Sequence, residues 1–307
     1  MAEYIISCES AVDIAPELAA EKGIRMISFH YALDEDEYVD DYYRSITQHD
    51  FFQRILDGAV SRTSALNTED YLEYFEPILK EGKDILHITL SSGLSSTYQN
   101  CCLAQEILCE KYPNRTIRVL DSLGASSGYG LLVLKIAEIK EKDNLSITEL
   151  FDRAKELRMH VNHLFFSTDL TFYIRGGRIS KTAGVFAQAL SICPLCDMDD
   201  MGFLVIREKV RTKAKVKKRI VEKMLELCDG RENYDDLCLM SHADFEDDAK
   251  DIVAMLEDRI PALKGRILLS PIGPTIGAHT GPGTIALFFI GAERQVSEKS
   301  LKARTNR

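Results

Sequence analysis

Strand-like and helix-like segments alternate along roughly the first 160 residues, and this alternation restricts the possible folds more than any other feature of the chain. The apolar runs "YIIS" (4–7), "DILHITL" (84–90) and "TIRVLDS" (116–122) are typical of strands, and a helical pattern follows each of them. Strands that alternate with helices are joined by crossovers and form a largely parallel sheet. Residues 1–160 therefore predict a Rossmann-like α/β domain with flanking helices, whose first helix has Asp13 as its candidate cap.

The second half has a different order of predicted strands and helices. A capping box from Ser146 to Glu149 opens a helix that ends near Met159. Strand patterns then follow at 163–168, 202–208, 236–242, 265–273 and 283–291, with helices near 184–192, 212–228 and 245–258. We expect an α+β domain with a mixed or antiparallel sheet over 161–295, a ligand cleft between the two domains, and a polar tail at 296–307.

Composition excludes several classes of protein. The net charge of -10 argues against nucleic-acid binding. No run approaches the roughly 18 apolar residues of a membrane span, and "MAEYIISCES" lacks the pattern of a secretion signal, so a cytoplasmic location is expected. The eight cysteines should then be reduced thiols. Cys193 and Cys196 have the spacing of half a zinc site, but no second pair follows at a matching interval, and no metal is predicted.

One segment opposes the overall charge. "REKVRTKAKVKKR" (207–219) has eight basic residues and one acid. Such a segment is either a solvated helix face or a docking surface for an anionic partner.

Three hydroxyl-rich loops are predicted at one edge of the parallel sheet. The first loop is "SSGLSST" (91–97), which contains Ser92, Ser95, Ser96 and Thr97. The second loop is "SRTSALN" (61–67), which contains Thr63 and Ser64. The third loop is "DSLGASSGYG" (121–130). Open α/β sheets bind ligands at the carboxyl ends of their strands, and the first turn of a helix attracts anions. Each serine is either a helix cap or a donor to a ligand, and the convergence of three loops favours a shared anion or carbonyl site.

Two glycine-rich motifs stand in the second half. "RGGRIS" (175–180) begins with Arg175, and "GPTIGAHTGPG" (273–283) contains Gly277 and places His279 in what reads as a loop between strands. A single histidine is often structural, but one with so little regular structure around it is also a candidate ligand.

These motifs resemble those of the DegV family of bacterial fatty-acid-binding proteins. "SSGLSSTYQN" is similar to its SSxLSGTYQ loop, "RTSALN" to its TSQPS loop, "RGGRIS" to its GGRIS segment, and "GPTIGAHTGPG" to its IGxxxGxHxGPG loop. Their order and spacing fit from about Tyr4 to Gly291.

The resemblance implies a carrier of a long-chain fatty acid, without cofactor or catalytic activity. The carboxylate would be held by Thr63, Ser95 and His279, with Ser64, Ser92, Ser96, Thr97, Gly277 and Arg175 around it. An apolar pocket would take the chain, with these candidates by position: Ile88, Leu90, Phe165, Phe166, Phe186 and Leu190. The carrier would present the carboxylate to a fatty acid kinase for phosphorylation to an acyl phosphate, and the basic segment would touch an anionic membrane surface.

The chain also departs from the family pattern. Ser96 replaces a glycine, Ala65 and Leu66 replace glutamine and proline, Glu9 replaces aspartate, and Cys193 replaces a lysine. The alternative function is a serine-dependent hydrolase or acyltransferase that uses Ser95 and His279. It would need an acid to orient the histidine, and the common α/β hydrolases also need a G-x-S-x-G turn, which this chain lacks at Ser95.

Overall fold

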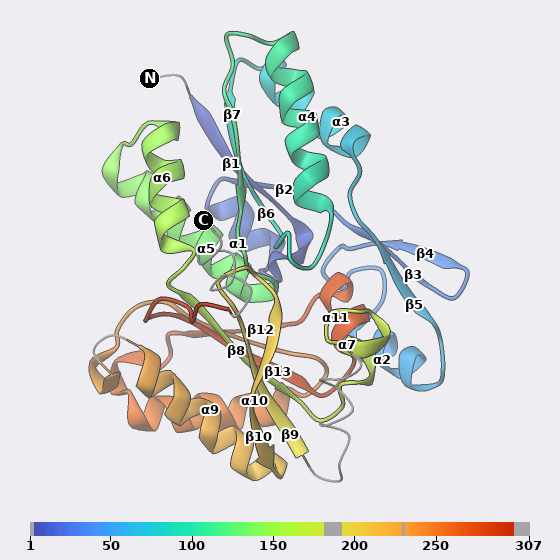
Figure 1. Cartoon of the computed structure of the whole chain (residues 1–307), viewed down its shortest axis with the longest axis vertical. Helices are drawn as coiled ribbons and strands as arrows, with labels where there is room; N and C mark the ends of the chain where they lie inside the picture. The colour runs from blue at the N-terminus through green and yellow to red at the C-terminus, as the bar shows by residue number, and fades with distance from the viewer. Residues whose placement is uncertain (1–2, 181–191, 229–230, 298–307) are drawn as a thin grey trace.

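The computed structural model describes residues 3–180, 192–228 and 231–297 of the chain. Within these ranges the strands form a four-stranded sheet (order β2-β1-β6-β7), a six-stranded sheet (order β10-β9-β8-β13-β11-β12) and a three-stranded sheet (order β4-β3-β5). Figure 1 shows the two larger sheets one above the other along the long axis of the molecule. In this described part of the chain, no helix is long and apolar enough to cross a membrane.

The four-stranded sheet lies in the N-terminal half and is parallel throughout. Its strands are β1 (Tyr4–Glu9), β2 (Ile24–Ile27), β6 (Asp84–Thr89) and β7 (Ile117–Asp121). The helices of this half are α1 (Pro16–Glu21), α3 (Thr68–Lys80), α4 (Thr97–Lys111), α5 (Ser126–Asp143) and α6 (Ile147–Leu157). The predicted Rossmann-like arrangement is confirmed.

The six-stranded sheet is mixed, because β11 and β12 pair in parallel and the other pairs are antiparallel. Its strands are β8 (Val161–Ser167), β9 (Ile192–Met198), β10 (Leu204–Arg211), β11 (Cys238–His242), β12 (Ile267–Pro271) and β13 (Thr284–Ile290). Two long helices, α9 (Lys213–Leu227) and α10 (Glu246–Arg259), pack together on one face of this sheet. The predicted mixed sheet is confirmed, although its strand β9 was not predicted. The helix expected near 184–192 lies outside the described residues except for Ile192, which begins β9.

Helix α5 joins the two larger sheets. It contacts β1 of the parallel sheet and also β8, β11 and β13 of the mixed sheet, and every residue from Ser126 to Leu134 is buried. Because α5 follows β7, its first turn lies at the carboxyl edge of the parallel sheet and faces the second half of the molecule.

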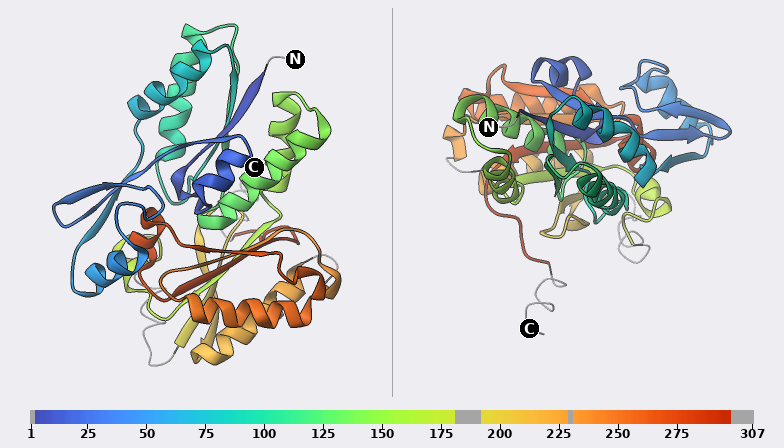
Figure 2. Two further views of the ribbon diagram at one scale, coloured as in Figure 1. Left: turned by 180° about the vertical axis from the view of Figure 1, so that it is seen from behind. Right: turned by 90° about the horizontal axis from the view of Figure 1, so that it is seen from above.

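Residues 30–64 form an arm whose three-stranded sheet the sequence did not predict, although "IRMISFHYAL" (24–33) reads as a strand and residues 49–57 as a helix. The arm contains β3 (His30–Leu33), β4 (Asp36–Val39), α2 (Gln48–Leu56) and β5 (Ser61–Ser64), and it projects sideways from the body (Figure 2). Strand β4 lies within the acidic stretch "DEDEYVDD" (34–41). Phe51 and Phe52 of the arm pack with Ala278 of α11 (Pro274–Thr280), so the arm belongs in space to the C-terminal half.

Two predicted helix caps have opposite outcomes. The capping box at Ser146 is present as expected. The cap predicted at Asp13 is wrong, because α1 begins at Pro16 without a side-chain cap and Asp13 ends a short 3-10 helix, η1 (Ser10–Val12). Its buried carboxylate instead accepts a hydrogen bond of 2.5 Å from the hydroxyl of Ser126, and so links η1 to the start of α5.

The buried carboxylate of Glu9 organises the polar interior of the parallel sheet. Its Oε1 accepts a hydrogen bond of 2.6 Å from the Tyr71 hydroxyl and lies 3.1 Å from His87 Nε2. Its Oε2 accepts bonds from the Tyr129 hydroxyl at 2.6 Å and from the backbone N–H of Leu90 at 2.9 Å. Since Leu90 directly follows β6, Glu9 fixes the start of the serine-rich loop.

Replacing Glu9 with leucine should therefore destabilise the protein. The Tyr71 hydroxyl and the N–H of Leu90 would lose their acceptor, His87 would lose its partner, and breaking such a buried polar network costs about 3–5 kcal/mol. Urea denaturation at neutral pH measures this loss, with Glu110→Leu on an exposed part of α4 as the control, expected to change stability by less than about 0.5 kcal/mol. Similar losses in both variants would contradict this role of Glu9.

Candidate functional site

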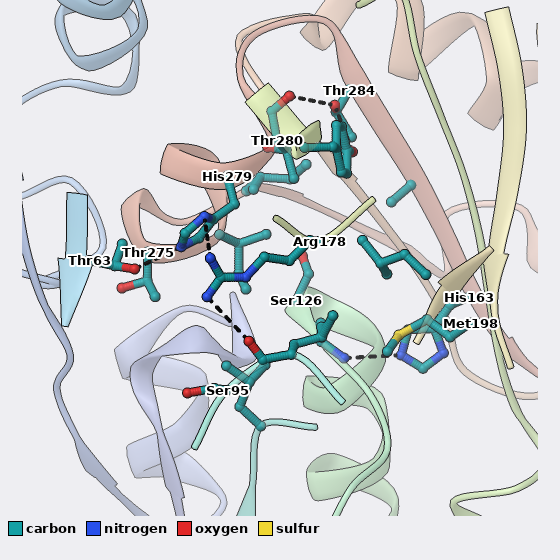
Figure 3. A pocket seen from close by; sticks show the side chains of 18 of the residues that line it. Thr63, Ser95, Ser126, His163, Arg178, Met198, Thr275, His279, Thr280 and Thr284 are labelled. Atoms are coloured by element: carbon teal, nitrogen blue, oxygen red, sulfur yellow. Dashed lines mark hydrogen bonds between the residues drawn. The ribbon is translucent and has the colours of Figure 1, made fainter. Parts of the chain in front are cut away.

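A cavity of about 270 Å³ lies where the parallel sheet, the arm and the mixed sheet meet. It is far larger than the 10–15 Å³ or so that one water molecule needs, so it is not a packing gap. Its walls are mainly apolar, and the larger apolar side chains include Phe29, Leu90, Leu94, Phe165, Met198 and Phe288. Figure 3 shows Thr63 and His279 at one end of the cavity and His163 and Met198 at the other.

Thr63 and His279 meet at the first of these ends although 216 residues separate them. Thr63 lies on β5, an edge strand of the arm, and His279 lies in the last turn of α11. Their Oγ1 and Nε2 atoms are 2.7 Å apart. A second bond, 3.1 Å from the Ser61 hydroxyl to the carbonyl of Ala278, holds the strand against the helix.

His279 lies on a helix, so the prediction of a glycine-rich loop is wrong. Pro274 begins α11, and Gly281 ends it with φ +66°. A Cβ at Gly281 would lie 2.1 Å from the ring of Phe172, so only glycine fits at this end. The glycines therefore shape the ends of a short helix whose position depends on packing against the arm.

The direction of the hydrogen bonds at His279 follows from Arg178. Nη1 of Arg178 lies 3.2 Å from Nδ1 of His279, and a guanidinium can only donate, so Nδ1 is an acceptor. Burial and the neighbouring charge of Arg178 lower the pKa of His279 to about 4, so the ring is neutral at pH 7. Its proton is then on Nε2, which donates to Thr63 Oγ1. The hydroxyl proton of Thr63 thereby remains free for a ligand.

The "RGGRIS" motif contributes Arg178 rather than the predicted Arg175. Arg175 is exposed at the end of α7 (Thr171–Arg175) and lies over the ring of Phe172, 5.4 Å from its centroid. Gly177 has φ +73° and reverses the chain, which directs Arg178 back to the cavity. A Cβ at Gly176 would lie 2.6 Å from His279 Nδ1, so this glycine makes room for the imidazole.

The serine-rich loop places Ser95 and Ser96 in the cavity wall. The hydroxyl of Ser95 accepts a bond of 3.2 Å from the N–H of Thr97, the first residue of α4, and lies 2.7 Å from the Thr97 hydroxyl. Ser95 thus supports the start of the helix and still faces the cavity. Arg178 also donates to the carbonyl of Leu94 at 3.2 Å, which ties this loop to the histidine.

The structure brings five of the predicted site residues to the wall of the cavity: Thr63, Ser64, Ser95, Ser96 and His279. The other five lie elsewhere. Thr97 is buried behind Ser95, Ser92 bonds through its N–H to Asp121, and Gly277 packs against the rings of Phe51 and Phe52. Arg175 is exposed, as described above.

Phe166 packs in the core under the other face of the mixed sheet, whereas its neighbour Phe165 lines the cavity. The other residues predicted to line the acyl-chain pocket have different outcomes. Leu90 lies in the cavity wall, and Ile88 lies in the core of the parallel sheet. Phe186 and Leu190 lie outside the described residues. Both faces of β8 are buried, so the sequence could not tell which face meets the cavity.

Sequence reasoning missed seven polar residues of the wall: Ser126, His163, Tyr173, Arg178, Thr275, Thr280 and Thr284. Ser126 was within a flagged loop, and Arg178 was within a flagged motif. Thr275 and Thr280 were within the motif that contains His279, whereas His163 had no signal, because it occurs singly in an apolar strand.

The geometry does not form a catalytic serine arrangement. His279 bonds to Thr63 on one side and faces Arg178 on the other, where a triad would need a carboxylate. The Ser95 hydroxyl bonds within its own loop. The described residues also contain no group of three or more His, Cys, Asp or Glu side chains that could hold a metal ion.

Comparison with known proteins identifies the family. The family model described as "Uncharacterised protein, DegV family" matches residues 5–292, and the chain therefore belongs to the DegV family. A DegV domain-containing protein of Clostridium perfringens is 32% identical over 297 residues, which cover 96% of this chain and 100% of that protein. One from Lactococcus lactis is 31% identical, with 94% and 97% covered. The family predicted from the four motifs is confirmed.

Solved structures share the fold. A DegV family protein of Ruminococcus gnavus, solved with vaccenic acid, has a TM-score of 0.81 at 22% identity and covers 93% of this chain and 99% of its own. A stearic-acid-binding protein of Eubacterium ventriosum has a TM-score of 0.81 at 23% identity, with 94% and 98% covered. The fatty acid kinase B3 protein of Streptococcus pneumoniae, loaded with linoleic acid, has a TM-score of 0.80 at 20% identity, with 94% and 99% covered. At these identities the likeness establishes the two-domain fold.

The lowered pKa of His279 predicts a loss of stability in acid. Between pH 6.5 and about 4 the unfolded chain binds a proton at this residue and the folded chain does not. The free energy of unfolding therefore decreases as the pH is lowered, by roughly 3 kcal/mol from pH 7 to pH 4. His279→Gln should remove this part of the slope in chemical denaturation. His163 and His242, whose pKa values are also lowered by burial, contribute equally to both proteins. Identical slopes would show that folding does not lower the pKa of His279.

Proposed function

We propose that the protein binds a long-chain fatty acid, with the carboxylate held by Thr63, Ser95 and His279 and the acyl chain in the apolar part of the cavity. The observation that carries this proposal is a cluster of hydrogen-bond donors at one end of a mainly apolar cavity. Proteins of the same fold that are solved with vaccenic, stearic or linoleic acid support it.

The donor cluster suits a carboxylate. Thr63 accepts from His279 and so offers its own proton, and Ser95 accepts from the Thr97 N–H and can do the same. None of the described residues that line the cavity is acidic, and the guanidinium of Arg178 adds a positive charge nearby. Charge-assisted bonds of this kind are stronger than bonds between neutral groups.

The orientation of the cavity supports a carrier that presents its head group. Ser64, Ala65 and Ser96 are exposed at the donor end, whereas His163, Met198 and Phe288 at the far end are each 3% exposed. A fatty acid bound in this direction hides its chain and turns its carboxylate to the surface. A fatty acid kinase is the partner that fits this arrangement, and the kinase-related name of the Streptococcus pneumoniae neighbour agrees with it. We place this exchange in the cytoplasm, where the eight free cysteines would stay reduced.

Replacing Ser95 with alanine should weaken fatty-acid binding by roughly 1.5–3 kcal/mol, the value of one hydrogen bond to a charged group. Calorimetric titration with hexadecanoate measures the change. Ser92→Ala is the matched control, because Ser92 belongs to the same loop and lies outside the cavity wall. Equal affinity of Ser95→Ala and the wild type would remove Ser95 from the site.

A serine-reactive fluorophosphonate probe separates the carrier from the alternative hydrolase. The carrier should not react, because Ser95 has no base within its hydrogen-bonding partners. Labelling of Ser95 would favour the enzyme.

The basic segment is mostly neutralised in the structure, which changes how its role can be tested. Lys213 and Lys217 both pair with Asp248, and Arg219 pairs with Glu208 and Glu226. Arg207 pairs with Asp197. Among the described residues, three exposed cations of the segment have no acid within ion-pair distance: Arg211, Lys215 and Lys218. They form the surface that we assign to the kinase and, during lipid exchange, to an anionic membrane.

Reversing these three cations to glutamate should leave the affinity for fatty acid unchanged but slow its delivery. Acyl-phosphate formation with the kinase and transfer from anionic vesicles are measured separately, at low and at physiological salt. The defect should shrink with salt, since exposed charges are screened beyond about 8–10 Å. The control reverses Lys80, Lys142 and Lys155 on the N-terminal helices. Equal rates for the two triple variants at low salt would show that the segment is only solvated.

A further inference from the structure

The end of the cavity opposite the head-group donors is closed by a histidine, His163. It lies on β8, two residues before Phe165, so both side chains point to the cavity face of the sheet. Directly across the sheet it pairs with Phe288 of β13, and the two rings meet edge to face with centroids 5.3 Å apart. With an exposed fraction of 3%, the imidazole is enclosed on all its other sides.

Both nitrogen atoms of this ring are already hydrogen-bonded to the protein. Nδ1 lies 3.1 Å from the carbonyl of Val161 and must donate to it, so Nε2 is the acceptor that receives the N–H of Ala125 at 3.3 Å. Burial and the charge of Arg294 keep the pKa of His163 well below its usual range, which agrees with a neutral ring. No polar atom of the ring is left for a ligand, so the side chain acts on the cavity through its shape.

The chain makes room for this ring with two glycines. A Cβ at Gly124 would lie 2.9 Å from Nε2, and a Cβ at Gly128 would lie 2.4 Å from Nε2 and 2.5 Å from the ring of Phe288. The imidazole therefore fills a gap between β8 and the first turn of α5 that no neighbouring side chain occupies. Without the ring, this gap would join the cavity, because Ala125 and Phe288 border both.

We infer that His163 sets the maximum length of the acyl chain, by blocking the space between β8 and α5. The inference rests on the proposed fatty-acid function and on the orientation that turns the carboxylate to the donor end. In this orientation the terminal methyl group meets His163, Met198 and Phe288. A chain longer than the cavity must then leave methylene groups in water or strain the wall.

The test compares affinities for saturated fatty acids from tetradecanoic to icosanoic acid in the wild type and in His163→Ala. The wild type should gain affinity with length and then stop gaining, whereas His163→Ala should continue to gain. Each methylene group that enters the new space should add about fourfold in affinity, because burial contributes about 0.8 kcal/mol per methylene. The readout is the ratio between long and short ligands, so a general loss of stability in the variant does not affect it.

Two further variants keep the test decisive. His163→Leu refills the gap without the polar atoms and should restore the length limit, although it also loses both hydrogen bonds. Gly128→Ala pushes the ring towards the cavity and should shift the preference to shorter chains even if His163→Ala fails to fold. An equal fall in affinity for every length in His163→Ala, with no shift in Gly128→Ala, would reduce His163 to a structural role. Failure of the wild type to bind any of these acids would instead overturn the proposed function.

Discussion

The hydrogen bond between Thr63 and His279 is the interaction on which the site depends, because it joins the arm to helix α11. Its direction is set by Arg178, which can only donate and therefore makes Nδ1 of His279 an acceptor. The neutral imidazole donates a hydrogen bond from its one N–H to the Thr63 hydroxyl oxygen, and the Thr63 hydroxyl can then donate outward. Gly176 is required for this chain of bonds, since any side chain there would displace the ring.

The arrangement separates two tasks within one cavity. The donor end is open to the surface and offers hydroxyl protons backed by a buried histidine and an arginine. The far end is closed by groups that have no polar capacity left, and so it favours hydrocarbon over water. Because α5 packs on both large sheets, the two ends are held in a fixed relation by the same helix. A ligand with a charged head and a long apolar chain matches both ends, whereas a small polar substrate would match only one.

The sequence predicted the two larger sheets well, because alternating strands and helices leave few other arrangements for residues 1–160. It did not predict the three-stranded sheet of the arm, since β4 and β5 have four residues each and "SRTS" in β5 has no apolar pattern. Strand β5 forms because helices α11 and α2 pack against the sheet of the arm. The contact with α11 joins parts of the chain that are far apart in sequence. The same reason explains His279: a seven-residue stretch flanked by Gly273 and Gly281 does not predict a helix, but packing against Phe51 and Phe52 stabilises one. Arg178 was missed because the turn at Gly177, and not the spacing of the arginines, decides which side chain faces the cavity.

The most direct test of the account is extraction and mass spectrometry of the lipid that copurifies with the protein. The account predicts long-chain fatty acids at about one per chain, retained by the Ser92→Ala control and depleted in a variant that lacks both Thr63 and Ser95 hydroxyls. Purified protein that carries no fatty acid, and takes none up from an excess in solution, would contradict it.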